Sequence, residues 1–234
     1  MLEAVFFDWG STLSQFTWDD ALLAAGHQAA LTALGRADEA ETFTARFREE
    51  TLPTVLAPGA ADRLDYGTEL RKLLDPVTDE QLDAYFDAEH AVWRPARALA
   101  DGMPKLLYAL HADGLAVGVI ANTWPDPPRL LRRELEEFGI ETQFDAVVLS
   151  SEVGVRKPAP AIFERALEEL GVDASAALHV GDRLVEDVQG AAGVGMLTAQ
   201  ALWFRIDPPM AEIEPDFMAF TPQDVLGFAR TLGR

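Results

Sequence analysis

The sequence predicts an α/β protein, a doubly wound parallel sheet with a helical domain inserted near its start. Three observations indicate this. From about residue 98, short apolar segments alternate with amphipathic ones, which is typical of buried parallel strands and their covering helices. Residues 5–7, Val-Phe-Phe, form a similar strand with no covering helix directly after it. The intervening segment is mostly helical in pattern. We therefore expect a core domain of residues 1–14 and 98–234 and a helical cap domain of residues 15–97.

The helices expected in the inserted segment begin at capping residues and end at helix breakers. Asp19 is a suitable N-cap for the first, and Gly35 follows its last turn. Thr78 begins a capping-box pattern at the last, because Gln81 lies three residues on. Four helices are expected, over residues 19–34, 39–50, 68–74 and 78–90. The second is followed by three breakers, Pro53, Pro58 and Gly59.

The remaining chain supplies the other strands and helices of the core. Strands are expected over residues 115–121, 144–149, 176–180 and 195–202. Helices are expected over residues 103–111, 129–138, 159–170, 185–192 and 222–232. In a parallel sheet the carboxyl ends of the strands lie at one edge, where ligands bind. Polar residues that follow these strands are therefore the candidates for a functional site.

Composition narrows the function classes. The chain has 234 residues, 49% apolar and 25% charged, which is ordinary for a globular protein. Its formal net charge of -20 disfavours nucleic acid and anionic membranes as partners, so we expect neither. It has no cysteine, no apolar run long enough to span a membrane and no basic leader, so we expect a cytoplasmic protein. We expect it to be a monomer or a homodimer. A site for an anionic substrate would need local positive charge.

Four segments place chemistry-bearing side chains at strand ends. They contain Asp8, Asn122, Lys157, and Asp182 with Asp187. The three carboxylates are hard oxygen ligands that suit Mg²⁺, which binds few carboxylates and retains substrate phosphate oxygens. The lysine is one of only three in the chain, and an aspartate beside a metal and a lysine can act as a nucleophile. Each residue also has an ordinary interpretation, as a helix cap, turn residue or exposed side chain, but all four segments together favour a site.

These segments together resemble the haloacid dehalogenase-like hydrolase superfamily, which has a Rossmann-like core and often a helical cap inserted after the first motif. The four matching motifs are Asp8-Trp9-Gly10-Ser11-Thr12-Leu13, Ala121-Asn122, Gly154-Val155-Arg156-Lys157-Pro158-Ala159-Pro160 and Gly181-Asp182-Arg183-Leu184-Val185-Glu186-Asp187. Their order and spacing agree with the family over nearly the whole chain.

The resemblance implies a role for each site residue. Asp8 would be the nucleophile, and Lys157 would hold the nucleophile and the phosphoryl group together. Mg²⁺ would be bound by Asp8, the Gly10 carbonyl, Asp182 and Asp187. The phosphate oxygens would be bound by Ser11, Thr12, Asn122 and Thr123. The expected partner is a small phosphorylated substrate.

Two departures from the family pattern affect the expected activity. Gly10 stands where family phosphatases have a second aspartate, the general acid/base. Ala121 stands where the family has a phosphate-binding hydroxyl, and Thr123 is the available substitute. General acid/base catalysis is typically worth ~10²–10⁴ in rate. Because Gly10 cannot supply it, we expect weak action on esters with poor leaving groups. The cap offers replacement acids, which are His27, Glu89 and His90.

The leading hypothesis is a Mg²⁺-dependent hydrolase of this superfamily, a phosphatase or phosphotransferase that forms an aspartyl-phosphate. A 2-haloacid dehalogenase is an alternative that Gly10 permits, since a halide needs no acid, but Asp182 and Asp187 disfavour it because that reaction needs no metal. A phosphonatase would need a cap lysine for an imine, and Lys72 is available. A non-catalytic or weakly active binder of phosphoryl ligands is the remaining alternative, favoured by Gly10 together with Ala121.

Overall fold

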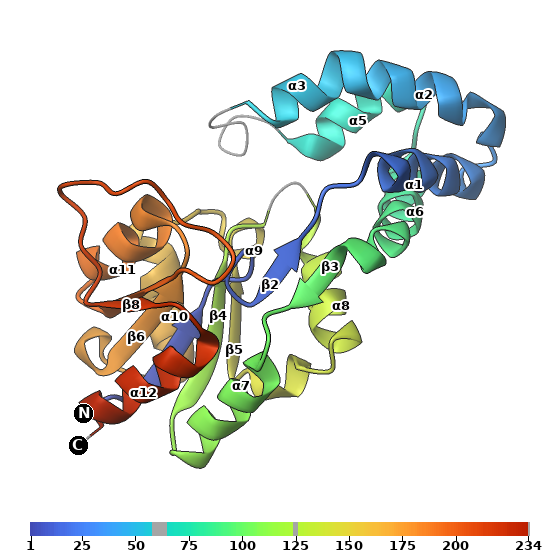
Figure 1. The fold of residues 1–234 in the computed structure, drawn as a ribbon. Coiled ribbons are helices and arrows are strands. Elements are labelled where there is room, and N and C mark those ends of the chain that lie inside the picture. Colours follow the sequence, from blue (N-terminus) through green and yellow to red (C-terminus); the bar gives the residue numbers. More distant parts are fainter. Residues whose placement is uncertain (58–64, 124–125, 234) are drawn as a thin grey trace. The chain divides into compact units, whose positions relative to one another are not determined.

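The computed structural model describes residues 1–57, 65–123 and 126–233, and its central element is a six-stranded parallel sheet (Figure 1). The strands follow the spatial order β5-β4-β1-β6-β7-β8. Their bounds are β1 Ala4–Phe7, β4 Ala116–Ala121, β5 Ala146–Leu149, β6 Ala177–Gly181, β7 Leu197–Ala201 and β8 Phe217–Ala219. The predicted fold class, a doubly wound parallel sheet flanked by helices, is confirmed.

Strand β1 lies in the middle of this sheet and is buried along its whole length. It pairs in parallel with β4 on one side and with β6 on the other, so that Phe7 is in register with both Val119 and Val180. The chain builds β4 and β5 on one side of β1, and β6, β7 and β8 on the other. The strand order therefore reverses at the carboxyl end of β1, and such a switch point is where open α/β sheets bind ligands.

Helices cover both faces of the sheet. The long ones are α7 Met103–Ala112, α8 Pro128–Glu137, α10 Pro160–Leu170 and α12 Pro222–Leu232. Helix α10 buries Ile162 and Phe163 against a core cluster that includes Phe6 and Ile120 from the sheet. The expected helix over 185–192 is instead a π-helical turn, η6 Leu184–Gln189, followed by the short α11 Gly190–Gly193.

Several short elements were not predicted from the sequence. Strands β2 Ser14–Phe16 and β3 Arg97–Leu99 pair in a two-stranded sheet separate from the central one. Strand β8 and the single turn α9 Ser150–Val153 were also missed. Strands of three residues and a single helical turn are too short for hydrophobic periodicity to reveal them.

The chain divides into two compact units. The sheet unit is Met1–Phe16, Ala98–Thr123 and Arg132–Arg234, and the helical unit is Thr17–Arg97 with the described residues of the segment 124–131. The sequence placed residues 126–131 in the core domain. They belong to the helical unit because Leu130 is buried in its hydrophobic cluster and Arg129 pairs with Asp83 and Asp87 of α6.

The helical unit consists of α1 Asp20–Ala33, α2 Ala40–Arg46, η2 Phe47–Thr51, α3 Leu52–Val55, α5 Tyr66–Leu74 and α6 Asp79–Val92. The predicted caps are present, because Asp19 accepts two N-terminal N–H groups of α1 and Thr78 forms a capping box with Gln81. Pro53 does not break a helix but lies in the first turn of α3, where its missing N–H costs nothing. Pro58 and Gly59 lie outside the described residues.

Candidate active site

The candidate site begins at Asp8, the first residue after β1. Its N–H donates to the carbonyl oxygen of Val180 at 2.8 Å, which continues the pairing with β6 for one residue. A tight turn follows, in which the Ser14 N–H donates to the Trp9 carbonyl at 2.9 Å and Ser11 adopts a left-handed φ of 57°. The turn ends the strand and leaves Asp8 at the carboxyl end of β1, where the strand order reverses.

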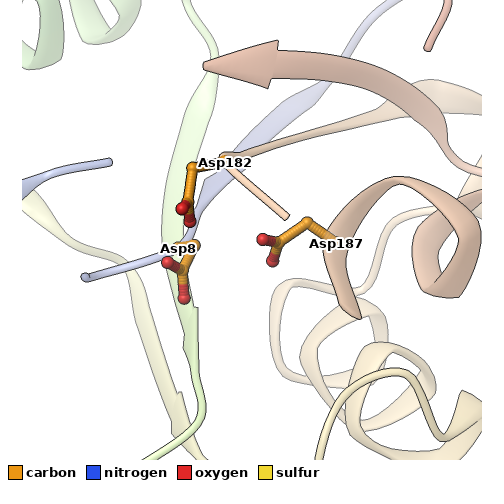
Figure 2. A group of neighbouring side chains, drawn as sticks. All are labelled: Asp8, Asp182 and Asp187. Carbon is orange, nitrogen blue, oxygen red and sulfur yellow. The ribbon is translucent and has the colours of Figure 1, made fainter. Parts of the chain in front are cut away.

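Two further carboxylates meet Asp8 there. Asp182 follows β6, and Asp187 lies in the π-helical turn η6. One carboxylate oxygen from each of the three residues lies within 4.8 Å of the others, and all three residues are buried (Figure 2). The fold therefore places three acidic groups, one from the turn after β1 and two from the segment after β6, around one point.

Lys157 is a buried cation that contacts two members of this cluster. Its Nζ donates to Oδ1 of Asp8 at 2.6 Å and to Oδ1 of Asp187 at 2.5 Å, and its side chain is 2% exposed. The side chain of Asn122 fixes the lysine backbone from both sides, since its Oδ1 accepts the Lys157 N–H at 2.8 Å and its Nδ2 donates to the Lys157 carbonyl at 3.1 Å. In this structure Asn122 positions the lysine.

Asp187 has the most donors of the three acids. Besides Lys157, it accepts a hydrogen bond from Nε2 of His179 at 2.9 Å and one from the N–H of Arg183 at 3.0 Å. His179 is fully buried in β6, and Phe163 packs edge-on against its ring. Sequence reasoning did not assign His179 a role, although an imidazole within an otherwise apolar strand was a visible signal.

Asp182 has the opposite character. Its Oδ2 is buried and has no hydrogen-bond partner among the described residues. The guanidinium of Arg205 lies 3.6 Å from that oxygen, at ion-pair distance. An orphaned carboxylate oxygen beside two other carboxylates is a suitable position for a hard divalent cation.

The pKa values of the three acids indicate that the cluster has too little positive charge around it. Burial raises the pKa of Asp8 to about 6, with Lys157 opposing and Asp187 adding to the rise. Burial, followed by the charges of Asp8 and Asp187, raises the pKa of Asp182 to about 8. Burial also acts to raise the pKa of Asp187, but Lys157 and His179 outweigh it and the pKa falls below its usual range. One lysine does not satisfy three buried carboxylates, and the residues present therefore fit a divalent cation.

Gly10, where the family has its acid/base, has room for a side chain. A Cβ built there would meet nothing within 4 Å among the described residues, and its φ lies outside the left-handed region. Its neighbours differ: Ser11 is half-buried, while the Thr12 hydroxyl is buried without a hydrogen-bond partner in the described parts of the chain. The Thr12 hydroxyl is therefore free of protein partners among the described residues, and its role as a phosphate donor stays a prediction.

Thr123 is committed elsewhere. Its hydroxyl pairs with the hydroxyls of Ser150 and Ser151 at 3.3 and 2.6 Å, and its N–H donates to the Ser150 hydroxyl at 3.0 Å. These contacts attach the end of β4 to α9. They offer no direct support for Thr123 as the replacement for the hydroxyl missing at Ala121.

The candidate acids of the helical unit differ among themselves. His27 is fully buried, with Phe43 and Phe47 edge-on to its ring, so it is a packing residue. His90 accepts a hydrogen bond at Nδ1 from Arg97 at 3.0 Å. Burial and the charge of Asp126 raise the pKa of Glu89 to about 7. A pKa raised to that value suits Glu89 to donating a proton near neutral pH.

Comparisons with known proteins identify the family to which these site motifs belong. The family model described as haloacid dehalogenase-like hydrolase matches residues 2–195. A glyceraldehyde 3-phosphate phosphatase of Pyrococcus abyssi is 36% identical over 138 residues, which are 58% of this chain and 55% of that protein. The match thus spans only about half the length of that curated relative. Among the described residues, no helix is long and apolar enough to cross a membrane.

Solved structures share the fold. A HAD phosphatase from Thermococcus onnurineus superposes with a TM-score of 0.66 at 24% identity, covering 97% of each chain. A 2-haloacid dehalogenase from Pseudomonas syringae superposes with a TM-score of 0.63 at 23% identity, covering 99% of this chain and 100% of that one. The same fold carries both chemistries, so the choice between them rests on the site.

Proposed function

The chain belongs to the haloacid dehalogenase-like hydrolase family, and from that premise we propose that it is a Mg²⁺-dependent phosphatase of a small phosphorylated metabolite. The observation that carries the proposal is the cluster of Asp8, Asp182 and Asp187, in which Asp182 Oδ2 has no hydrogen bond from any described residue. Asp8, Asp182 and the Gly10 carbonyl would hold the ion, with Asp187 beside them. The ion would neutralise charge on the phosphoryl oxygens.

Asp8 is the proposed nucleophile. A carboxylate oxygen of Asp8 forms a bond to phosphorus as the bond from phosphorus to the leaving oxygen breaks, which gives an acyl phosphate on Asp8. Water then attacks that phosphorus, inorganic phosphate leaves, and the carboxylate is regenerated. Lys157 contacts Asp8 at 2.6 Å, so it keeps that carboxylate oriented and partly ionised despite its burial. The buried hydroxyl of Thr12 is the proposed donor to a phosphoryl oxygen.

The charge of the site favours phosphoryl transfer over dehalogenation. Displacing a halide from carbon requires no metal, and three buried carboxylates would then face a single buried lysine. The raised pKa values of Asp8 and Asp182 indicate that this arrangement lacks positive charge. Phosphonate cleavage through an imine is also disfavoured, because the Lys72 side chain is 63% exposed and its Nζ donates to both oxygens of Glu69. It lacks the desolvation that activates lysine nucleophiles.

The decisive assay compares leaving groups. Acetyl phosphate and p-nitrophenyl phosphate should be hydrolysed with Mg²⁺ and not with EDTA, and Asp8→Asn should abolish both reactions. The name of the Pyrococcus relative makes glyceraldehyde 3-phosphate the first natural substrate to assay. Release of halide from 2-chloropropionate without metal would replace the proposal by the dehalogenase. The absence of turnover on every substrate, with Mg²⁺ and phosphate still bound, would establish the non-catalytic alternative.

A further inference from the structure

The loop between β7 and β8 is hydrogen-bonded to the candidate site at two points. Nε1 of Trp203 donates to the carbonyl of Thr12 at 2.9 Å, in the turn that follows Asp8. Oδ2 of Asp207 accepts the N–H of Leu184 at 3.1 Å, at the start of η6. Arg205 lies between these two attachments in sequence. All of these residues belong to the sheet unit.

Arg205 divides its guanidinium between two carboxylates. Its Nη2 donates to Oδ1 of Asp207 at 2.5 Å, and its Nη1 lies 3.6 Å from Oδ2 of Asp182. The first contact is a hydrogen bond and the second is only an ion pair, so the donors on Nη1 are not spent on Asp182. The Arg205 side chain is 36% exposed, whereas that of Asp182 is 2% exposed. The arginine therefore borders both the buried acids and solvent.

Charge balance explains why a second cation would be needed here. Lys157 and one divalent ion together balance the three carboxylates of Asp8, Asp182 and Asp187. An arriving phosphoryl dianion would then bring charge that neither of them offsets. Arg205 is the cation already at ion-pair distance from Asp182, and a guanidinium suits phosphate oxygens because its donors form a planar fork.

We propose that Arg205 is an anion-binding residue that shares Asp182 with the metal. Without metal, its guanidinium partly neutralises Asp182. When a divalent ion occupies Asp182, the guanidinium remains attached to Asp207 and binds an anionic oxygen of the substrate. The inference rests on the proposed metal-dependent phosphatase and deepens it, because it requires a substrate whose phosphoryl or adjacent anionic group reaches the β7–β8 loop.

The proposal predicts effects of opposite sign on two ligands in Arg205→Gln. Mg²⁺ alone should bind about two- to fivefold more tightly than to wild type, the range expected for losing a partly exposed competing ion pair. Inorganic phosphate, in the presence of saturating Mg²⁺, should bind at least roughly tenfold more weakly, because a charge-assisted hydrogen bond is lost. Both affinities are measured by calorimetry and by the shift in Tm, without any turnover assay.

Three variants control the experiment. Arg165→Gln removes the same charge from an exposed pair with Glu169 on α10 and should change neither affinity. Arg205→Lys keeps the positive charge but loses the planar arrangement of guanidinium donors. Its Mg²⁺ affinity should stay close to that of wild type, and its phosphate affinity should fall. Asp207→Asn leaves Arg205 in the chain but removes its charged attachment, and should weaken phosphate binding.

The outcomes separate this inference from the proposed function. Unchanged phosphate affinity in a folded Arg205→Gln, or weaker Mg²⁺ binding, would overturn the role of Arg205 while leaving the phosphatase standing. Wild-type protein that binds no Mg²⁺ at all would overturn both.

Discussion

A Cβ built on Gly181 would lie 2.2 Å from Cγ of Asp187, so only glycine fits at the end of β6. The carboxyl group of Asp187 rests directly on this bare backbone. Three donors then approach it: Lys157, His179 and the N–H of Arg183. Contact on one side and hydrogen bonds on the others fix the carboxylate that in turn orients the lysine.

The first prediction concerns His179, which donates to Asp187 from within the core. His179→Phe keeps a ring against Phe163 but removes the Nε2 donor. We expect kcat to fall about tenfold or more, the usual order for losing such a supporting contact, while KM changes little. Phe163→Leu is the matched control, because it disturbs packing but keeps the hydrogen bond. If both variants lose stability but keep wild-type kcat, His179 is only a packing residue.

The second prediction concerns the metal. Mg²⁺ at millimolar concentration should raise Tm by several degrees, because an ion bound only to the native state stabilises it by mass action. Asp182→Asn should lose that shift. Without metal, the same variant should be at least as stable as wild type, because it removes a buried carboxylate whose Oδ2 has no hydrogen bond within the described parts of the chain. A Mg²⁺ shift that survives in Asp182→Asn would place the ion elsewhere.

The third prediction concerns Gly10. Since its position is open and its backbone accepts an L side chain, Gly10→Asp should fold with a Tm close to that of wild type. The new carboxyl group should speed hydrolysis of alkyl phosphates by up to ~10²–10⁴, and the gain should be smaller for acyl phosphates, whose leaving group needs no proton. Gly10→Asn is the control, with a similar shape and no acid. Equal rates in the two variants would show that no proton donor was missing.

The fourth prediction concerns the pH dependence of stability. The only hydroxyl proton of Thr44 is donated to Ala40, so Thr44 accepts from Nδ1 of His27, and Nε2 of that imidazole is buried without a partner among the described residues. Burial, assisted by the charge of Arg48, lowers the pKa of His27 to about 4. Protonation would create a buried N–H without an acceptor.

The sign of this effect follows from the lowered pKa. The unfolded chain takes up the proton near pH 6.5 and the folded one only near pH 4. The contribution of His27 is therefore complete above pH 6.5 and is lost as the pH falls to 4, by up to about 3 kcal/mol. Denaturant titrations across this range should show the loss in wild type. A flatter profile in His27→Gln, whatever its absolute stability, supports the assignment; identical slopes contradict it.

Sequence patterns predicted the regular part of the fold because long apolar strands and capped helices are set locally. The first helix begins after Asp19 and the last helix of the inserted segment after Thr78, as their side chains dictate. The meeting of Asp8 with Asp182 was predictable for a different reason. Both follow strands of one parallel sheet, whose carboxyl ends share an edge.

The remaining features depend on tertiary contacts that leave little trace in the sequence. The hydrogen bonds between the Asn122 amide and the backbone of Lys157 were not foreseen, and ligand binding by Asn122 stays a prediction. Arg205 lies in a loop without periodicity, so nothing local distinguished it from other exposed arginines. Residues 126–131 were assigned to the wrong unit because the burial of Leu130 depends on helices far away in the chain.

The central place of β1 has a consequence for how the protein is made. Its first strand leaves the ribosome before either neighbour exists, since the partners are Ala116–Ala121 and Ala177–Gly181. At typical elongation rates the wait for β6 is on the order of ten seconds or more. The contiguous helices of Thr17–Arg97 emerge within that interval and can collapse first. The apolar segment at residues 4–7 thus stays without its strand partners while the helical unit folds.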